Sequence, residues 1–186
     1  KEKGRKFFHH AGSARARTLH QHNMHLVAFS TDRKILTGDA PLQRAYAAHF
    51  DSYTIFVGSK GLKVGGRRAI ADNAQAIGFT WKLFFSWELW QLLRRADVVS
   101  SQDPFETGLF AWTVATLFRK PLHVQVHTDI FSPAFARMHR GNGIRQSVAR
   151  WVLARATRVR VVSLALKEKL IASGVKVPIT ILPIFV

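Results

Sequence analysis

The stretch that decides the fold runs from Ala96 to Pro133 and reads ADVVSSQDPFETGLFAWTVATLFRKPLHVQVHTDIFSP. Ala96 to Gln102 is a short apolar run typical of a β-strand, and Phe105 to Arg119 is apolar, aromatic and long enough for a helix. Leu122 to His127 is a second β run with two β-branched valines. A strand, a helix and a strand with tight connections form a βαβ unit. The pattern therefore predicts neighbouring parallel strands joined by a right-handed crossover.

Strand and helix patterns alternate through the rest of the chain. Strands are predicted at Met24–Phe29, Tyr53–Val57, Arg158–Ser163 and Ile179–Phe185. Helices are predicted at Pro41–Phe50, Phe79–Arg95, Ile144–Ala156 and Leu164–Ser173. Loops are predicted at Ser30–Asp39 and Arg137–Gly143, and Arg67–Gly78 is ambiguous, with a strand open near Gln75–Ile77. Such alternation predicts the α/β class: a doubly wound, mainly parallel, Rossmann-like sheet over residues 24–186.

The composition of the chain limits the classes of fold and function that it can have. With 186 residues, 47% of them hydrophobic, it is large enough for one domain with a sizeable core. It has no Cys, which excludes disulfides, thiolate nucleophiles and Cys-based zinc sites. No run reaches the roughly 18 uncharged apolar residues of a membrane span. The formal charge of +17 favours a polyanion, either nucleic acid or an anionic membrane surface, without choosing between them.

The first 23 residues, KEKGRKFFHHAGSARARTLHQHN, are basic and rich in His and show no periodicity. We expect them to form a disordered tail. They lack the apolar core of a signal peptide. The helix expected at Phe79–Arg95 is aromatic on several sides and has four charges. It fits either core packing or a helix lying on a membrane surface, where Trp and basic residues are favoured.

Polar residues follow three of the predicted strands, at the edge where open α/β sheets bind their ligands. They are Asp32, Arg33 and Lys34 after the first strand, Asp103 and Glu106 in the βαβ unit, and His127, Thr128 and Asp129 at its end. These are the candidate site residues. Structural alternatives stay open for most of them: a capping box for Asp103 with Glu106, a turn cap for Asp129, and a solvated loop for residues 32–34.

Four stretches of the chain resemble the N-terminal half of family 4 glycosyltransferases of GT-B architecture. They are MHLVAFSTDRKIL at Met24–Leu36, VVSSQDPFETGLFAW at Val98–Trp112, PLHVQVHTDIFSP at Pro121–Pro133, and RATRVRVVSLALKEKL at Arg155–Leu170 followed by ITILPIFV. Their order and spacing are more specific than any one motif, and together they span most of residues 24–186.

The resemblance implies two Rossmann-like domains that face each other across a cleft. The N-terminal domain binds a saccharide or lipid-linked acceptor, and the C-terminal domain binds a nucleotide-diphosphate sugar as co-substrate, with no metal. His127 then contacts the reacting sugar as the catalytic residue. Because the chain stops at Val186, we expect it to need a C-terminal domain, its own or a partner's, and to be inactive alone. We expect a cytoplasmic location, peripheral on the inner face of the cell membrane.

Two other classes of function compete with glycosyl transfer. Charge alone favours a basic nucleic-acid-binding module, but the chain lacks RNP, KH and zinc-finger patterns, so we expect no specific nucleic acid. A Rossmann-like nucleotide-binding domain fits the strand and helix order. However, no GxGxxG precedes a helix and no GxxxxGK[ST] occurs, which leaves that function without its phosphate-binding loop.

Overall fold

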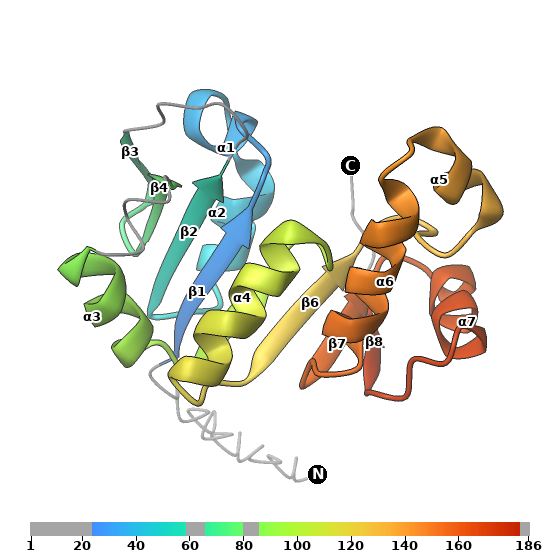
Figure 1. Ribbon diagram of the computed structural model, residues 1–186. Helices are drawn as coiled ribbons and strands as arrows, with labels where there is room; N and C mark the ends of the chain where they lie inside the picture. The colour runs from blue at the N-terminus through green and yellow to red at the C-terminus, as the bar shows by residue number, and fades with distance from the viewer. Residues whose placement is uncertain (1–23, 59–65, 80–85, 183–186) are drawn as a thin grey trace, which may run out of the picture.

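The computed structural model describes residues 24–58, 66–79 and 86–182, and these form an eight-stranded sheet with helices on both faces (Figure 1). The strands are β1 (His25–Ser30), β2 (Ser52–Gly58), β3 (Arg67–Ala71), β4 (Ala74–Phe79), β5 (Val98–Ser101), β6 (Leu122–Val126), β7 (Arg158–Val161) and β8 (Ile179–Ile181). The helices are α1 (Lys34–Thr37), α2 (Pro41–Ala47), α3 (Trp87–Arg95), α4 (Glu106–Leu117), α5 (Pro133–Met138), α6 (Asn142–Leu153) and α7 (Leu164–Ala172).

The strand order is β3-β4-β2-β1-β5-β6-β7-β8. All neighbouring pairs are parallel except β3 with β4. From the central strand β1 the chain first builds one side of the sheet and then, from β5, the other. The order therefore reverses between β1 and β5, and such switch points are where doubly wound sheets bind ligands. The predicted fold class and the predicted βαβ unit are confirmed.

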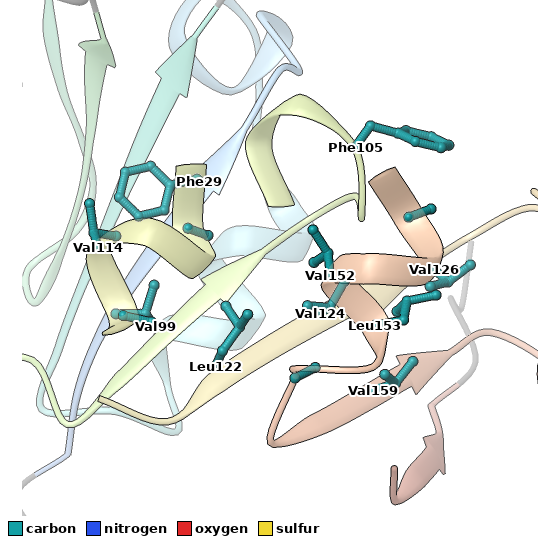
Figure 2. Packing of buried hydrophobic residues seen from close by; sticks show 14 of the residues in the cluster. Phe29, Val99, Phe105, Val114, Leu122, Val124, Val126, Val152, Leu153 and Val159 are labelled. Carbon is teal, nitrogen blue, oxygen red and sulfur yellow. The ribbon is translucent and has the colours of Figure 1, made fainter. Parts of the chain in front are cut away.

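Alternate residues of each strand face opposite sides of the sheet, so the structure has two hydrophobic cores. On the larger one, drawn in Figure 2, β1, β5, β6 and β7 pack beneath α3, α4, α6 and α7, with Val99, Val124 and Val152 fully buried. On the other, β1, β2 and β4 pack beneath α1 and α2, around Ile35 and Ile55. Near-continuous apolar strands such as β2 are the expected sequence of a sheet covered on both faces.

Serine residues start three of the helices on the larger core. The hydroxyls of Ser86, Ser132 and Ser163 accept hydrogen bonds from backbone amides three residues later, over 3.2, 3.1 and 3.2 Å. Each satisfies one of the amide groups that a helix start leaves without a partner. In the part of the chain that is described, no helix is both long and apolar enough to cross a membrane.

Several sequence predictions were wrong in detail. The Ser30–Asp39 loop contains the one-turn helix α1, which is held by burial of Ile35. The predicted Arg137–Gly143 loop is shorter: only residues 139–141 connect the end of α5 to the start of α6. The ambiguous segment forms the antiparallel hairpin of β3 and β4, which confirms the strand left open near Gln75–Ile77.

The helix predicted from Phe79 begins later. Phe79 ends β4, where it is paired in register with Gly58, and α3 starts at Trp87. The Phe79 ring packs edge-on against Phe29 and Phe56, and this contact favours a strand over a helix at Phe79. Residues 80–85 of that prediction, the predicted tail (1–23) and the last residues of the predicted strand Ile179–Phe185 lie outside the described residues.

Candidate functional site

A cavity of about 630 Å³ opens beyond the carboxyl ends of β1, β2 and β4, beside the starts of α4 and α6. Part of its lining is aromatic, from Phe29, Phe56, Phe79 and Phe110. The Phe110 ring lies 5.0 Å from that of Phe29 and 4.9 Å from that of Phe79, centroid to centroid. The rest of the lining is largely polar and comprises Ser30, Thr31, Glu106, Thr107, His139, Asn142 and Arg145, with Gly58 and Gly141.

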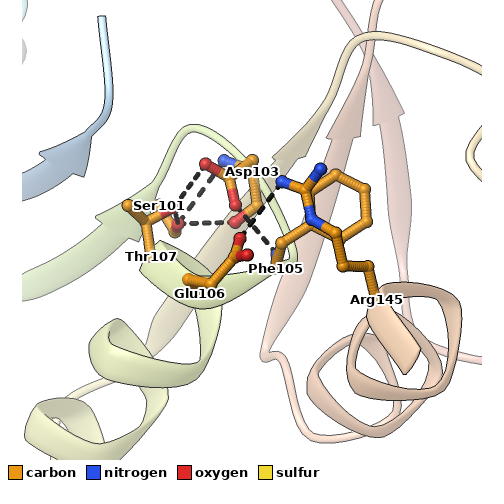
Figure 3. Close-up of polar contacts among 6 residues, drawn as sticks. All are labelled: Ser101, Asp103, Phe105, Glu106, Thr107 and Arg145. Carbon is orange, nitrogen blue, oxygen red and sulfur yellow. Dashed lines mark hydrogen bonds and ion pairs between the residues drawn. The ribbon is translucent and has the colours of Figure 1, made fainter. Parts of the chain in front are cut away.

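The loop between β5 and α4 forms a tight hydrogen-bonded turn at one side of this cavity (Figure 3). Ser101 Oγ donates to the Asp103 carbonyl over 2.6 Å. The Asp103 carboxylate accepts from the Phe105 amide, over 2.8 Å, and from the Thr107 hydroxyl. The N-cap residue of α4 is Phe105 rather than Asp103, so the predicted capping box is wrong. The Asp103 side chain stabilises the turn, whereas the Glu106 side chain bonds to a residue of another helix.

Glu106 pairs with an arginine from another helix. Its Oε2 accepts from Nη2 of Arg145 on α6, over 3.1 Å. The Arg145 guanidinium also lies over the Phe105 ring, 4.2 Å from the centroid (Figure 3). Its Nε is buried and has no hydrogen-bond partner within the described structure. The cavity wall therefore holds a carboxylate and a guanidinium side by side, and both are fixed in position.

His127 follows the last residue of β6 at the carboxyl edge of the sheet, where part of the residue contacts solvent and the imidazole packs among neighbouring protein atoms. Burial among neighbouring protein atoms lowers its pKa below the usual value for histidine. The charge of Arg160 lowers this pKa further, and the Asp103 carboxylate opposes the shift. At neutral pH the imidazole is therefore uncharged, with one nitrogen able to donate and the other able to accept a hydrogen bond.

Arg160, on β7, is a buried cation that no candidate set from the sequence contained; its exposed fraction is 9%. Its guanidinium donates to the Tyr46 hydroxyl, to Gln125 Oε1 over 3.0 Å and to the Leu182 carbonyl over 3.1 Å. None of the ion pairs between described residues includes Arg160. Its charge is thus held by neutral acceptors, and it contributes a positive potential at His127.

The other predicted site residues lie outside the cavity. The Asp129 carboxylate accepts from Lys169 Nζ on α7, over 2.7 Å, and Ser132, not Asp129, caps α5. Thr128 is exposed beside it. Asp32, Arg33 and Lys34 are exposed at the start of α1, where Asp32 Oδ1 accepts from the Lys34 amide over 3.0 Å. This geometry agrees with the solvated-loop alternative for residues 32–34.

Two of the candidates, Glu106 and His127, are thus left as possible functional groups at the carboxyl edge. Glu106 enters the cavity together with Arg145, His139 and Thr107, which sequence reasoning missed. His127 lies at the neighbouring strand ends, within the electrostatic influence of Asp103 and Arg160. In the described part of the chain no group of three or more His, Asp or Glu residues could hold a metal ion, so the candidates include no metal ligand set.

The sequence of the chain matches the model of a known family. Residues 14–184 match the glycosyl transferase 4-like domain, and this range takes in every described strand and helix. The chain belongs to that family. The match begins within the basic stretch before Met24. No curated protein sequence matches the chain.

Solved structures place this glycosyl transferase 4-like domain in the same fold group. A sucrose-phosphate synthase structure from Thermosynechococcus elongatus matches with a TM-score of 0.58 and 13% identity, over 86% of this chain and 89% of that one. The UDP-GlcNAc 2-epimerase of Methanocaldococcus jannaschii matches with a TM-score of 0.51 and 15% identity, over 85% of this chain. The chain spans 45% of that epimerase. Two such different activities on one fold leave the chemistry to be argued from the site.

Proposed function

We propose that this domain is the acceptor-binding part of a glycosyltransferase, which moves a sugar from a nucleotide-sugar donor to a saccharide or lipid-linked acceptor. The observation that supports this best is the cavity at the carboxyl edge of the sheet. The Glu106–Arg145 pair offers fixed donors and acceptors for sugar hydroxyls. The Phe110 and Phe79 rings beside it offer an apolar surface for the C–H faces of a sugar ring or for an apolar group attached to it.

His127 is the proposed catalytic residue. Glycosyl transfer passes through an oxocarbenium-like sugar, and the acceptor hydroxyl loses its proton as the new bond forms. A neutral imidazole at the strand end is able to accept that proton or to hold a hydroxyl of the reacting sugar. The Asp103 carboxylate favours the imidazolium that proton transfer creates, whereas burial and, to a lesser extent, Arg160 lower the pKa and favour the neutral resting ring.

The donor belongs to a second domain in this proposal. Residues of that domain, or of a partner subunit, bind the nucleotide diphosphate and complete the cleft, and the chain alone does not transfer sugar. The family resemblance supports this division. The reaction then requires no metal, because cationic side chains and helix N-termini stabilise the leaving diphosphate. We also propose that transfer takes place on the cytoplasmic side of the cell membrane, where a lipid-linked acceptor is reached.

Ligand titrations of the isotope-labelled chain, followed by NMR, test the division between donor and acceptor. The probes are methyl glycosides of common hexoses, UDP-glucose, NAD and a short RNA. We expect a methyl glycoside to shift the amides of Thr107, Phe110 and Arg145, and UDP-glucose to leave them unchanged. Arg145→Gln weakens the glycoside response, whereas Arg150→Gln, on the outer face of the same helix, does not. Tight binding of NAD, or of RNA at physiological salt, contradicts the proposal.

A further inference from the structure

Helix α3 carries an exposed stripe of two tryptophans and an arginine. Leu89 and Leu93 face the core, whereas Trp87, Trp90 and Arg94 follow one another at i, i+3 and i+7 on the opposite side. Trp87 is 71% exposed and Trp90 38% exposed. Single exposed apolar residues are ordinary, but two large aromatic rings on one helix face require an explanation.

Residues at the end of α4, the neighbouring helix in Figure 1, contact this side of α3. The Phe118 ring meets the Trp90 ring edge-on, with 5.2 Å between centroids. Lys120 Nζ donates to the Arg94 carbonyl over 3.0 Å. Leu117 beside them is 55% exposed. We call these residues the α3–α4 surface: Trp87, Trp90, Arg94, Leu117, Phe118, Arg119 and Lys120.

The α3–α4 surface is basic as well as apolar. It contains three cationic side chains, Arg94, Arg119 and Lys120, and no carboxylate. The nearest acidic side chains along the sequence are already engaged: Glu88 pairs with Arg67, and the Asp97 carboxylate accepts from the His25 amide over 2.8 Å. Because the whole chain also carries a formal charge of +17, the field at this surface attracts anions.

We infer that the α3–α4 surface docks onto an anionic lipid bilayer. Tryptophan rings are favoured at the boundary between headgroups and acyl chains, where the apolar ring is buried and the indole N–H stays hydrated. Leu117, exposed at the end of α4, adds apolar area. Arginine and lysine contribute attraction to negatively charged headgroups. A nucleic acid would be drawn to the charges but gains little from Leu117, so the combination of exposed apolar and cationic groups favours the bilayer.

This inference deepens the proposed membrane location, but it stands on residues that the cavity does not include. Loss of vesicle binding and loss of glycoside binding are therefore separate outcomes. A chain that binds glycosides but no vesicles refutes only the docking surface. A chain that binds vesicles but no glycosides refutes only the acceptor site.

Flotation of the full chain with vesicles tests the inference. One set of vesicles contains phosphatidylcholine alone, and the other contains phosphatidylcholine mixed with phosphatidylglycerol. We expect binding to the anionic vesicles only, and weaker binding as salt is raised. Arg94→Gln and Arg119→Gln each lower the affinity about five-fold, the equivalent of about 1 kcal/mol per cation. Trp87→Ser with Leu117→Ser lowers it at least as much, because both side chains are already exposed and their loss spares the fold.

The matched control changes an exposed apolar residue and an exposed arginine elsewhere, Met138→Ser with Arg137→Gln on α5, and is expected to bind vesicles like the wild type. Circular dichroism confirms that each variant is folded. Equal vesicle binding by the α3–α4 variants and the control overturns the inference. So does failure of the wild type to bind anionic vesicles while the same substitutions abolish RNA binding or self-association.

Discussion

The hydroxyl of Ser30, at the end of β1, donates a 2.5 Å hydrogen bond to Oε1 of Gln102, directly beyond β5. The two residues lie on either side of the point where the strand order reverses. Ser30 Oγ also accepts from the Asp32 amide over 3.0 Å, and the Ser30 side of the pair lines the cavity. The two hydrogen bonds of Ser30 therefore connect the first loop to the strand ends at the switch point, beside the cavity wall.

Replacing Ser30 with Ala removes both of these hydrogen bonds in a buried place, since Ser30 is 1% exposed. We expect Ser30→Ala to lower the free energy of unfolding by about 1–3 kcal/mol, because the Asp32 amide and the Gln102 oxygen lose their partner. Urea denaturation measures this. Ser147→Ala is the control, because Ser147 is exposed and bonds only within its own helix; an equal loss in both variants contradicts the assigned role.

For His127→Ala we expect kcat to fall by about 100-fold or more in the assembled transferase, with a smaller change in KM, because proton transfer is lost and most acceptor contacts remain. Steady-state kinetics with the donor and acceptor of that enzyme provide the measurement. His123→Ala, from the interior of the same strand, is the matched control. If His123→Ala costs as much as His127→Ala, the loss is structural and the catalytic role is wrong.

His123 in β6 and His127 directly after it predict a pH dependence of stability. Burial, as the larger cause, and a nearby arginine lower the pKa of both His123 and His127. Between the lowered values and the ordinary one of about 6.5, the unfolded chain binds protons that the folded chain does not. The free energy of unfolding therefore falls as the pH drops through this window, and is unaffected by these groups above it.

Thermal unfolding at a series of pH values from about 7.5 to about 5.5 tests this dependence. We expect the wild type to lose stability toward the acid end more steeply than the variant with both His123→Gln and His127→Gln, in which neither side chain titrates. Parallel curves for the two proteins would show that burial of the imidazoles does not set the slope.

The Glu106–Arg145 pair is predicted to affect binding more than stability. Both side chains are partly exposed, at 55% and 39%, so solvent screens the ion pair and its coupling contributes about 1 kcal/mol or less to folding. A double-mutant cycle of Glu106→Gln and Arg145→Gln measures this in denaturant. The same variants are expected to weaken the response to a methyl glycoside at least ten-fold. A large folding coupling with unchanged glycoside binding would assign the pair a structural role.

The order of the elements could be predicted from the sequence because each carries a local signal. The valines of β6 and the apolar run of α4 predict their own structures, and short connections make the βαβ unit the natural outcome. The β3–β4 hairpin has a weaker signal, since β3 is an edge strand that starts with Arg67 and Arg68 and is largely exposed. The sequence that begins at Phe79 fits a helix, and only the contacts of the Phe79 ring with Phe29 and Phe56 favour a strand at this residue.

The candidate site was harder to predict because its parts are distant in sequence. Spacing alone made Glu106 the partner of Asp103, whereas its ion-pair partner Arg145 lies 39 residues further on. Arg160 sits in a strand whose alternation suggests an ordinary exposed arginine, and only the sheet register brings it beside Gln125. Position at a strand end did predict Glu106 and His127 as neighbours of the carboxyl edge, because that rule depends on topology rather than on contacts.

The start of α4 approaches its surroundings so closely at Gly108 that a Cβ there would lie 2.7 Å from the Asp103 carbonyl and 3.3 Å from a methyl group of Val152 on α6. The absence of a side chain at Gly108 therefore allows α4 and α6, which carry Glu106 and Arg145, to pack this closely. An engineer who wishes to change what the cavity accepts can vary exposed lining residues such as Thr31 or His139. Residue 108 has to stay glycine, because any side chain there would displace the Asp103 carbonyl or Val152 and disturb the turn that precedes Glu106.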